Sequence, residues 1–429
     1  MPESQDRTLQ EWLSWIERCH PSEIELGLER LTQVYQRLAL DLSASRKVII
    51  GGTNGKGSTV ALLDQVLRDA GCSVGCFTSP HFLRYNERIK LAGQPVEDAL
   101  LVEAFEAIDQ ARESTSLTYF EYNTLAALYI FSRQKPDVML LEVGLGGRLD
   151  AVNIIDADLA IVTTVSVDHV DWLGDDREKI GYEKAGIYRA GKPALCGDPN
   201  PPKMLLDYAA EIDADLYCRG ETFELNHRDD GLWDWRGRSV VGTELQLNNL
   251  PDINLPKANA ATVLQALQIL QIEIDHQALC ASLKRARLTG RMQEIEYKGY
   301  TYLLDVAHNP EASAYLTQRL QKRPVQGRNI LILGMLADKD IDQVISSFKC
   351  IVDQWLLVTL DVPRGQSAAQ LAEKSQQQNI PVDSQTTYDT VQEAISDLQT
   401  QLQPDDRVII AGSFFTVSDA LIALNMDGR

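Results

Sequence analysis

The chain has few basic residues for its length, and this shortage narrows the class of partners. It carries 41 Lys and Arg residues against 61 Asp and Glu residues, which leaves a formal net charge of −20. Proteins that bind nucleic acid normally present a surplus of positive charge to the phosphates. We therefore expect no nucleic-acid partner, and a polyanionic ligand must meet positive charge that is concentrated locally.

Paired cysteines and long apolar runs are also lacking. The seven cysteines are scattered singly between Cys19 and Cys350 without a C-x-x-C pair, as is typical of reduced thiols in the cytosol. No apolar run approaches the length that spans a membrane, and the opening Met-Pro-Glu-Ser-Gln-Asp is unlike a signal peptide. The sequence therefore predicts a soluble cytoplasmic protein with no membrane partner.

The strongest motif of the chain lies at residues 47–60, Lys-Val-Ile-Ile-Gly-Gly-Thr-Asn-Gly-Lys-Gly-Ser-Thr-Val. An apolar strand leads into a glycine-rich loop, a lysine and the start of a helix. Backbone N–H groups, the helix N-terminus and the Lys56 ammonium together make a cradle for a polyphosphate. The strict G-x-x-x-x-G-K-[ST] pattern is missed at Ile50 and Gly57. The alternative is a turn that only joins a buried strand to a helix. This alternative is less favourable, because glycines lose much conformational entropy when they are ordered and no ligand would offset that cost.

The chain of 429 residues is long enough for two or three domains. Strand-like runs alternate with helical stretches, which indicates an α/β protein with a mostly parallel sheet and helices on both faces. Amphipathic helices are expected at 9–16 and 28–38, and a helix at 259–270. Residues 218–250 predict a small antiparallel excursion. Strands are expected at 48–50, 73–77, 138–141, 159–163, 193–196, 302–306, 329–333, 356–360 and 407–411.

The second strand series begins after Arg291, so we place a domain boundary near residues 292–298. The predicted division is a P-loop-type, mostly parallel sheet domain at 1–294, which carries the polyphosphate cradle, and a smaller Rossmann-like α/β domain at 295–429.

Acidic and hydroxyl side chains follow other strands of the expected sheet. Glu142 ends the strand 138–141 and precedes a glycine-rich segment, a position that usually holds the metal of a bound nucleotide. Mg²⁺ favours such oxygen ligands. An exposed acid without a partner is the alternative. For Ser79 two interpretations are open: its hydroxyl completes the metal shell, or the residue only forms a turn. His169 lies between two acids and is either a metal ligand or a structural histidine.

Weaker candidates lie further along the chain. Residues 182–186 indicate the last turn of a helix with a glycine cap, where Lys184 is ordinarily solvated. Asp305 and His308 follow a strand of the second series and are placed to face a ligand between the domains. Arg291 lies on the predicted linker, from which we expect its positive charge to reach a phosphate of the ligand.

Together these motifs resemble the bacterial bifunctional dihydrofolate synthase/folylpolyglutamate synthase family of the Mur ligase superfamily, and the similarity runs essentially end to end. Phe415 and Ala337 stand where relatives commonly carry polar residues. The segments that carry the resemblance are 20–30, 52–58, 78–81, 120–122, 142–151, 168–169, 183–187, 290–291 and 305–310.

The resemblance implies an ATP-dependent ligase that adds L-glutamate to 7,8-dihydropteroate and to folates such as tetrahydrofolate through an acyl phosphate. It implies Mg²⁺ as the cofactor and ATP as a co-substrate, and we expect a monomer. Lys184 matches a lysine that is carbamylated in this family, and Lys56, Lys184 and His169 form the implied catalytic group. The implied metal ligands are Ser79, Glu142 and His169. The implied ATP contacts are Thr53, Asn54, Gly55, Lys56, Gly57, Ser58, Asn259, Arg291 and Asp305. The implied pteroate or folate contacts are Ser22, Ile24, Thr118, Tyr119, Phe120, Glu121, Leu149, Asp150 and Ala151.

Three rival functions remain at this point. One is a Mur ligase that acts on a UDP-muramyl cell-wall precursor instead of dihydropteroate. Another is a GTP-dependent switch, because residues 171–174 fit D-x-x-G, although the chain has no Asn-Lys-x-Asp for guanine. The third is a nucleotide-gated binding protein without chemistry. Phosphate release with glutamate and each acid substrate separates them.

Overall fold

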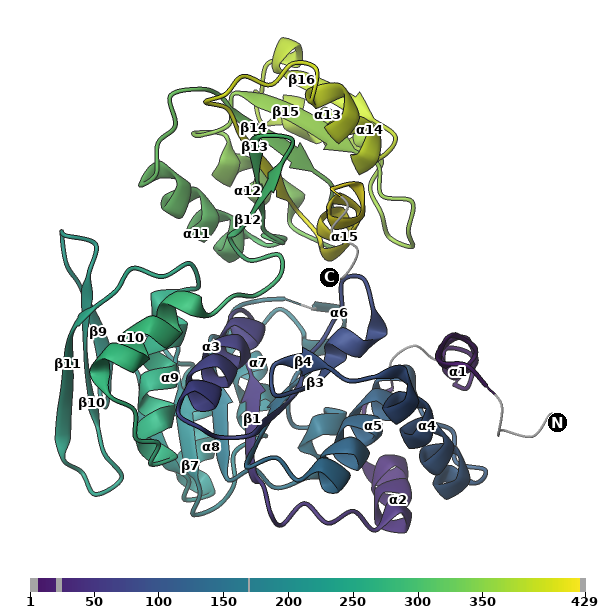
Figure 1. Cartoon of the computed structure of the whole chain (residues 1–429), viewed down its shortest axis with the longest axis vertical. Helices are drawn as coiled ribbons and strands as arrows, with labels where there is room; N and C mark the ends of the chain where they lie inside the picture. The colour runs from purple at the N-terminus through teal and green to yellow at the C-terminus, as the bar shows by residue number, and fades with distance from the viewer. Residues whose placement is uncertain (1–6, 21–24, 169, 425–429) are drawn as a thin grey trace. The chain divides into compact units, whose positions relative to one another are not determined.

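The computed structural model describes residues 7–20, 25–168 and 170–424. The chain forms two compact units, Met1–His81 with Tyr85–Ala286 and Phe82–Arg84 with Arg287–Arg429 (Figure 1). The sequence-based division after residue 294 stays a prediction. Within the described ranges, every helix is too short or too polar to span a membrane.

An eight-stranded sheet forms the centre of the first unit, in the order β4-β3-β2-β5-β1-β6-β7-β8. Its strands are β1 (Arg46–Gly51), β2 (Val74–Phe77), β3 (Ile89–Leu91), β4 (Gln94–Pro95), β5 (Val138–Glu142), β6 (Leu159–Val162), β7 (Pro193–Cys196) and β8 (Asp215–Cys218). All neighbours pair in parallel from β2 to β8, and only the edge strands β3 and β4 are antiparallel. The mostly parallel sheet predicted for this part of the chain is confirmed.

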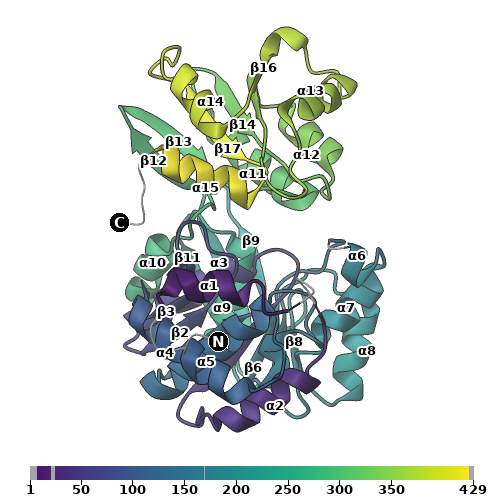
Figure 2. The ribbon, with the colours of Figure 1, turned by 90° about the vertical axis from the view of Figure 1, so that its right-hand side faces the viewer.

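Helices cover both faces of this sheet. Alternate strand residues such as Ile49, Leu141 and Val162 join an apolar cluster with helices on one face, since successive side chains point to opposite faces. Helices α3 and α9 pack together with the sheet on the other face (Figure 1), and α7 packs against α8 (Figure 2). The helices are α1 (Leu9–Ile16), α2 (Glu29–Leu38), α3 (Lys56–Asp69), α4 (Asp98–Arg112), α5 (Tyr119–Gln134), α6 (Val170–Leu173), α7 (Arg177–Ala185), α8 (Lys203–Glu211), α9 (Lys257–Ile269) and α10 (His276–Arg285), with 3-10 turns η2 (Tyr85–Arg88) and η3 (Ala151–Ile154).

The predicted antiparallel excursion is a three-stranded sheet of β9 (Glu224–His227), β10 (Trp233–Arg238) and β11 (Glu244–Leu250). Trp233 and Trp235 alternate along β10 and are fully buried. Their indole N–H groups donate to Pro251 O at 2.7 Å and to Ala261 O at 3.1 Å. These bonds fasten the small sheet beside α9.

The second unit is built on a six-stranded sheet in the order β12-β13-β17-β14-β15-β16, parallel except for β12. Alternate residues, such as Ile332 and Leu333, belong to two separate apolar clusters, so both faces are covered. The strand expected at 356–360 lies at Gln354–Val358, because Leu360 N–H already bonds Gln366 O in the following loop. The elements are β12 (Gln293–Tyr297), β13 (Tyr300–Leu304), α11 (Pro310–Gln321), β14 (Asn329–Leu333), α12 (Ile341–Phe348), β15 (Gln354–Val358), α13 (Ala368–Gln377), η4 (Val382–Ser384), β16 (Gln385–Tyr388), α14 (Val391–Leu398), β17 (Arg407–Ala411) and α15 (Phe414–Ala423).

Candidate active site

The glycine-rich loop between β1 and α3 is held by the segment that follows β6. Thr53 N–H donates to Thr164 O at 2.7 Å, and Asn54 N–H donates to the Thr164 hydroxyl at 3.2 Å. The Thr53 hydroxyl donates to Ser166 O at 3.0 Å, and Ser166 N–H returns a bond to Thr53 Oγ1 at 3.0 Å. Because β6 pairs in parallel with β1, both segments leave the same edge of the sheet. The loop is therefore braced by the protein itself.

Two glycines of the loop leave no room for a side chain. Gly52 has φ +136° and Gly55 has φ +90°, in the region that favours glycine. A Cβ on Gly52 would lie 1.9 Å from Thr163 Oγ1, and one on Gly55 would lie 2.7 Å from Asn259 Oδ1. Asn259, buried on α9, also donates its Nδ2 to Gly55 O at 3.4 Å. The structure thus brings Asn259 into contact with the phosphate loop.

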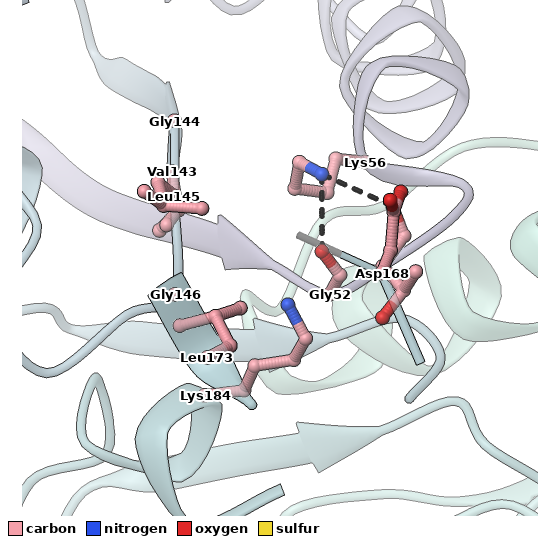
Figure 3. A pocket seen from close by; sticks show the side chains of 10 residues that line it. Gly52, Lys56, Val143, Gly144, Leu145, Gly146, Asp168, Leu173 and Lys184 are labelled. Carbon is pink, nitrogen blue, oxygen red and sulfur yellow. Dashed lines mark hydrogen bonds between the residues drawn. The ribbon is translucent and has the colours of Figure 1, made fainter. Parts of the chain in front are cut away.

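Lys56 begins α3 and folds back over the loop. Its Nζ donates to Gly52 O at 3.0 Å and to Thr53 O at 3.1 Å (Figure 3). No side chain of the described residues caps the N-terminus of α3. Since the first N–H groups of a helix lack intrahelical acceptors, those of Gly57 and Ser58 are placed to bind an anion beside the Lys56 ammonium.

A small pocket opens next to this loop, and Figure 3 shows the amino groups of Lys56 and Lys184 turned toward the same space. The phosphate loop, the glycine-rich segment after β5 and the end of α7 all contribute to its walls. The lining residues are Gly52, Thr53, Lys56, Val143, Gly144, Leu145, Gly146, Asp168, Leu173 and Lys184.

Lys184 is buried, with 4% of its surface exposed, although the sequence pattern favoured a solvated lysine. Burial and the positive charge of Lys56 lower the pKa of Lys184 to about 7, against the opposing effect of Asp168 and Asp150. Removing an ammonium from water beside a second cation is unfavourable. The site therefore disfavours the charged form of this lysine.

Close packing of the glycine-rich segment against the end of α7 explains this burial. A Cβ on Gly147 would lie 2.7 Å from Glu183 O, and one on Gly186 would lie 2.3 Å from Arg148 Cβ. Arg148 Nη2 donates to Glu183 Oε1 at 2.8 Å, and its backbone N–H donates to Glu183 O at 2.8 Å. Gly186 does occupy the C-cap, but with φ −60° it is right-handed. Glycine is needed there for the close approach and not for a left-handed cap.

Glu142 ends β5 and is buried, so the alternative of an exposed acid does not hold. Ser79 N–H donates to Glu142 Oε2 at 3.2 Å. Glu142 also pairs with Ile50 of β1, which puts its carboxylate at the edge from which the phosphate loop leaves.

Ser79 and Glu142 fit a hard divalent cation, because hydroxyl and carboxylate oxygens are the ligands that Mg²⁺ favours while it keeps several waters. His169, the third predicted ligand, lies outside the described residues. Those residues contain no group of three or more His, Cys, Asp or Glu side chains arranged for a metal.

The predicted substrate segment at 118–121 begins α5 and is held by a capping box. Thr118 N–H donates to Glu121 Oε2 at 2.7 Å, and Glu121 N–H donates to Thr118 Oγ1 at 3.3 Å. The buried Glu121 carboxylate also pairs with Arg30 at 3.1 Å. Phe120 packs on Gly144, where a Cβ would lie 2.5 Å from Phe120 Cζ. The segment therefore lies against one wall of the pocket.

Asp150 is buried and braces the glycine-rich segment. Its Oδ2 accepts the N–H groups of Gly144 at 3.0 Å and Leu145 at 2.8 Å, and its Oδ1 accepts Val152 N–H at 3.0 Å. Burial raises the pKa of Asp150 to about 6 in spite of these donors. Leu149 and Ala151, which are also predicted to bind the substrate, lie on either side of Asp150 in the chain. The predicted substrate contacts Ser22 and Ile24 lie outside the described residues.

Arg291 and Asp305 belong to the second unit. The buried Asp305 carboxylate accepts Met292 N–H at 2.9 Å and Ala307 N–H at 3.1 Å. Burial raises the pKa of Asp305, and the Arg291 charge acts against this rise. The Arg291 guanidinium lies 5.5 Å from the centre of the Phe414 ring.

Asp168 and Leu173 line the pocket but were not among the predicted functional residues. A signal for Asp168 was present, because it is an acid shortly after a strand and directly before His169. Leu173 lies on α6, which has only four residues. A helix this short shows no periodic pattern in the sequence, so its place in the pocket wall was not predictable.

Comparison with known proteins identifies the family. The Mur ligase middle domain matches residues 50–196, and the Mur ligase glutamate ligase domain matches residues 290–414. The dihydrofolate synthase/folylpolyglutamate synthase of Escherichia coli (strain K12) is 42% identical over 413 residues, which cover 96% of this chain and 94% of that protein.

Solved structures agree with this assignment. Escherichia coli FolC in complex with DHPP and ADP is 40% identical, with a TM-score of 0.92 and 100% of both chains covered. The Yersinia pestis bifunctional enzyme complexed with AMPPNP and Mn is 42% identical, with a TM-score of 0.90, over 99% of this chain and all of that one. The chain therefore belongs to the bacterial dihydrofolate synthase/folylpolyglutamate synthase family, whose members are ATP-dependent ligases of the Mur ligase superfamily.

Proposed function

We propose that this protein adds L-glutamate to the carboxylate of 7,8-dihydropteroate and then to folates such as tetrahydrofolate, at the expense of ATP. The observation that carries the proposal is one pocket lined by the braced phosphate loop and two inward lysines, next to the Ser79–Glu142 pair. Relatives that bind ADP with DHPP, or AMPPNP with Mn, support a site for a nucleotide, a pterin acid and a divalent cation.

The reaction must first make a carboxylate electrophilic. The carboxylate oxygen attacks the γ-phosphorus of ATP, ADP leaves, and an acyl phosphate forms. The amine of glutamate then attacks the acyl carbon and loses a proton. The C–O bond to phosphate breaks, so that the products are an amide and inorganic phosphate.

The end of the phosphate loop stabilises the transferring group in this proposal. Thr53 and Asn54 already use their backbone N–H groups on Thr164, so we assign them to shaping the loop. The N–H groups of Gly55–Ser58 and the Lys56 ammonium face the phosphates. Preorganised donors of this kind act where negative charge develops, and they need no reorganisation during the reaction.

Ser79, Glu142 and His169 are the proposed ligands of Mg²⁺. When bound, the cation supplies positive charge that offsets the phosphate oxygens. The cation in the Yersinia pestis relative is Mn, so the choice of Mg²⁺ is part of the proposal.

Lys184 is the proposed site of carbamylation. Its neutral Nζ attacks the carbon of CO₂ and releases a proton, which leaves an anionic carbamate. Burial beside Lys56 disfavours an ammonium at this place, whereas a carbamate forms an attractive pair with Lys56.

The remaining site residues keep their proposed roles. Asn259, Arg291 and Asp305 contact the nucleotide, while the segments 118–121 and 149–151, with Ser22 and Ile24, contact the pterin acid. A monomeric state and a cytoplasmic location also remain predictions.

An assay of the purified protein with ATP, Mg²⁺, L-glutamate and dihydropteroate carrying heavy oxygen in its carboxylate tests the mechanism. We expect ADP, an amide product, and one heavy oxygen in the released orthophosphate. Orthophosphate without label contradicts the acyl phosphate. ADP release only with a UDP-muramyl substrate contradicts the proposed substrate.

A further inference from the structure

Arg88, the last residue of η2, is a buried arginine that has no acidic partner among the described residues. It is 8% exposed, and its Nε donates to His81 Nδ1 at 2.8 Å. Within the part of the chain that the structure describes, no Asp or Glu side chain forms an ion pair with Arg88. Among the same described residues, His81 Nδ1 is the one acceptor that receives a hydrogen bond from the Arg88 guanidinium.

The surroundings of this guanidinium are aromatic. Its central carbon lies 5.4 Å from the Tyr119 ring centre and 5.8 Å from the Tyr85 ring centre. Because His81 accepts through Nδ1, that nitrogen carries no proton. Aromatic faces and one such histidine offset a buried cation only in part, so the arrangement favours a bound anion.

Arg88 also lies next to the candidate reaction site. Its carbonyl accepts Thr78 N–H at 2.9 Å, immediately before Ser79, whose own N–H bonds Glu142. Tyr119 is followed by Phe120, which packs on Gly144 of the pocket wall. An anion that binds Arg88 is therefore close to the elements that hold the reactants.

We propose that Arg88 recognises a substrate carboxylate other than the one that is phosphorylated. A guanidinium presents parallel N–H donors that match the two oxygens of a carboxylate. The inference rests on the proposed function, which brings two sources of such a group to the site. These sources are the incoming L-glutamate and the glutamyl tail of a folate substrate, a tail that dihydropteroate lacks.

Arg88→Gln and Arg88→Lys test the proposal through KM and kcat in both reactions. We expect Arg88→Gln to raise the KM of the recognised substrate about 10- to 100-fold, with a smaller change in kcat. Arg88→Lys keeps the charge without the fork and should lie between Arg88→Gln and wild type. Arg133→Gln is the matched control, because Arg133 also lies over a ring, that of Tyr129, but is mostly exposed and pairs with Glu103 at 3.6 Å.

The two reactions separate the two sources. If Arg88 binds the incoming amino acid, the KM of glutamate rises with both dihydropteroate and tetrahydrofolate. If it binds the glutamyl tail, the KM of tetrahydrofolate rises and that of dihydropteroate does not.

Substrate analogues distinguish recognition from a structural role. Wild type should discriminate against α-carboxamide analogues of glutamate or of the folate tail, and folded Arg88→Gln should lose that discrimination. Equal losses with carboxylate and carboxamide substrates, or unchanged KM values, overturn the proposal. If Arg88→Gln does not fold, the same comparison uses Arg88→Lys. An inactive wild type instead contradicts the proposed function, because the Arg88 comparison requires active enzyme.

Discussion

Lys56 illustrates how much depends on one side chain at the residue scale. Its Nζ bonds the carbonyls of Gly52 and Thr53, so it lies directly over the place proposed for the phosphates. We expect Lys56→Ala to lower kcat at least about 100-fold, because it removes a charge that acts on the transferring group. Steady-state phosphate release measures this, and circular dichroism checks the fold. Lys203→Ala, on an exposed lysine of α8, is the control, and wild-type turnover in Lys56→Ala contradicts the assignment.

Lys184 makes a second prediction at the same scale. Lys184→Ala removes the group that carries the proposed carbamate, and we expect activity to fall about 100-fold or more, as for other groups that place charge at a reaction centre. Formate or acetate supplies a carboxylate of similar shape to the vacated space and should restore part of the activity. The measurement is turnover as a function of added carboxylate. Full activity without any supplement rules the carbamate out.

Asp150 gives a prediction at the scale of an element, the glycine-rich segment after β5. Burial raises the pKa of its carboxyl from 3.8 to about 6. The unfolded chain therefore loses this proton at lower pH than the folded protein, so the contribution of Asp150 to stability declines as pH rises through 6. Between pH 5 and pH 7 this decline amounts to about 1.4 kcal/mol in the free energy of unfolding.

Asp150→Asn removes that decline. We expect the difference in the free energy of unfolding, variant minus wild type, to increase by about 1.4 kcal/mol from pH 5 to pH 7. Denaturant unfolding at each pH measures this difference. Replacement of the exposed Asp207 by Asn provides the control for general charge effects. If the free energy of unfolding changes with pH in the same way for Asp150→Asn and wild type, the raised pKa of Asp150 is contradicted.

Elements with a regular apolar pattern were predictable, and short ones were not. The strand 48–50 and the helix after Lys56 were expected because each shows the period of its structure. The edge strands β3 and β4 span Ile89–Leu91 and Gln94–Pro95, too short for an alternation to show. The shift of β15 to Gln354–Val358 has a different origin, because Leu360 is apolar but its backbone is used by a loop.

At the scale of the whole molecule, the proposed function assigns both activities to the same phosphate site. One bound nucleotide activates one acid at a time, so dihydropteroate and tetrahydrofolate must compete. We expect dihydropteroate to inhibit glutamylation of tetrahydrofolate competitively, with an inhibition constant within about threefold of its own KM. Initial rates in mixtures of the two acids measure this, and rates that add independently point to two separate sites.

The local residue pattern was enough to predict the phosphate loop, the acid at the end of β5 and the alternation of strands and helices. These features depend on neighbours in the chain. The burial of Lys184, the bracing role of Asp150 and the contact of Asn259 with Gly55 were decided by tertiary structure alone. Their cause is close approach between distant segments, which glycines such as Gly147 and Gly186 permit and which no pattern along one segment encodes.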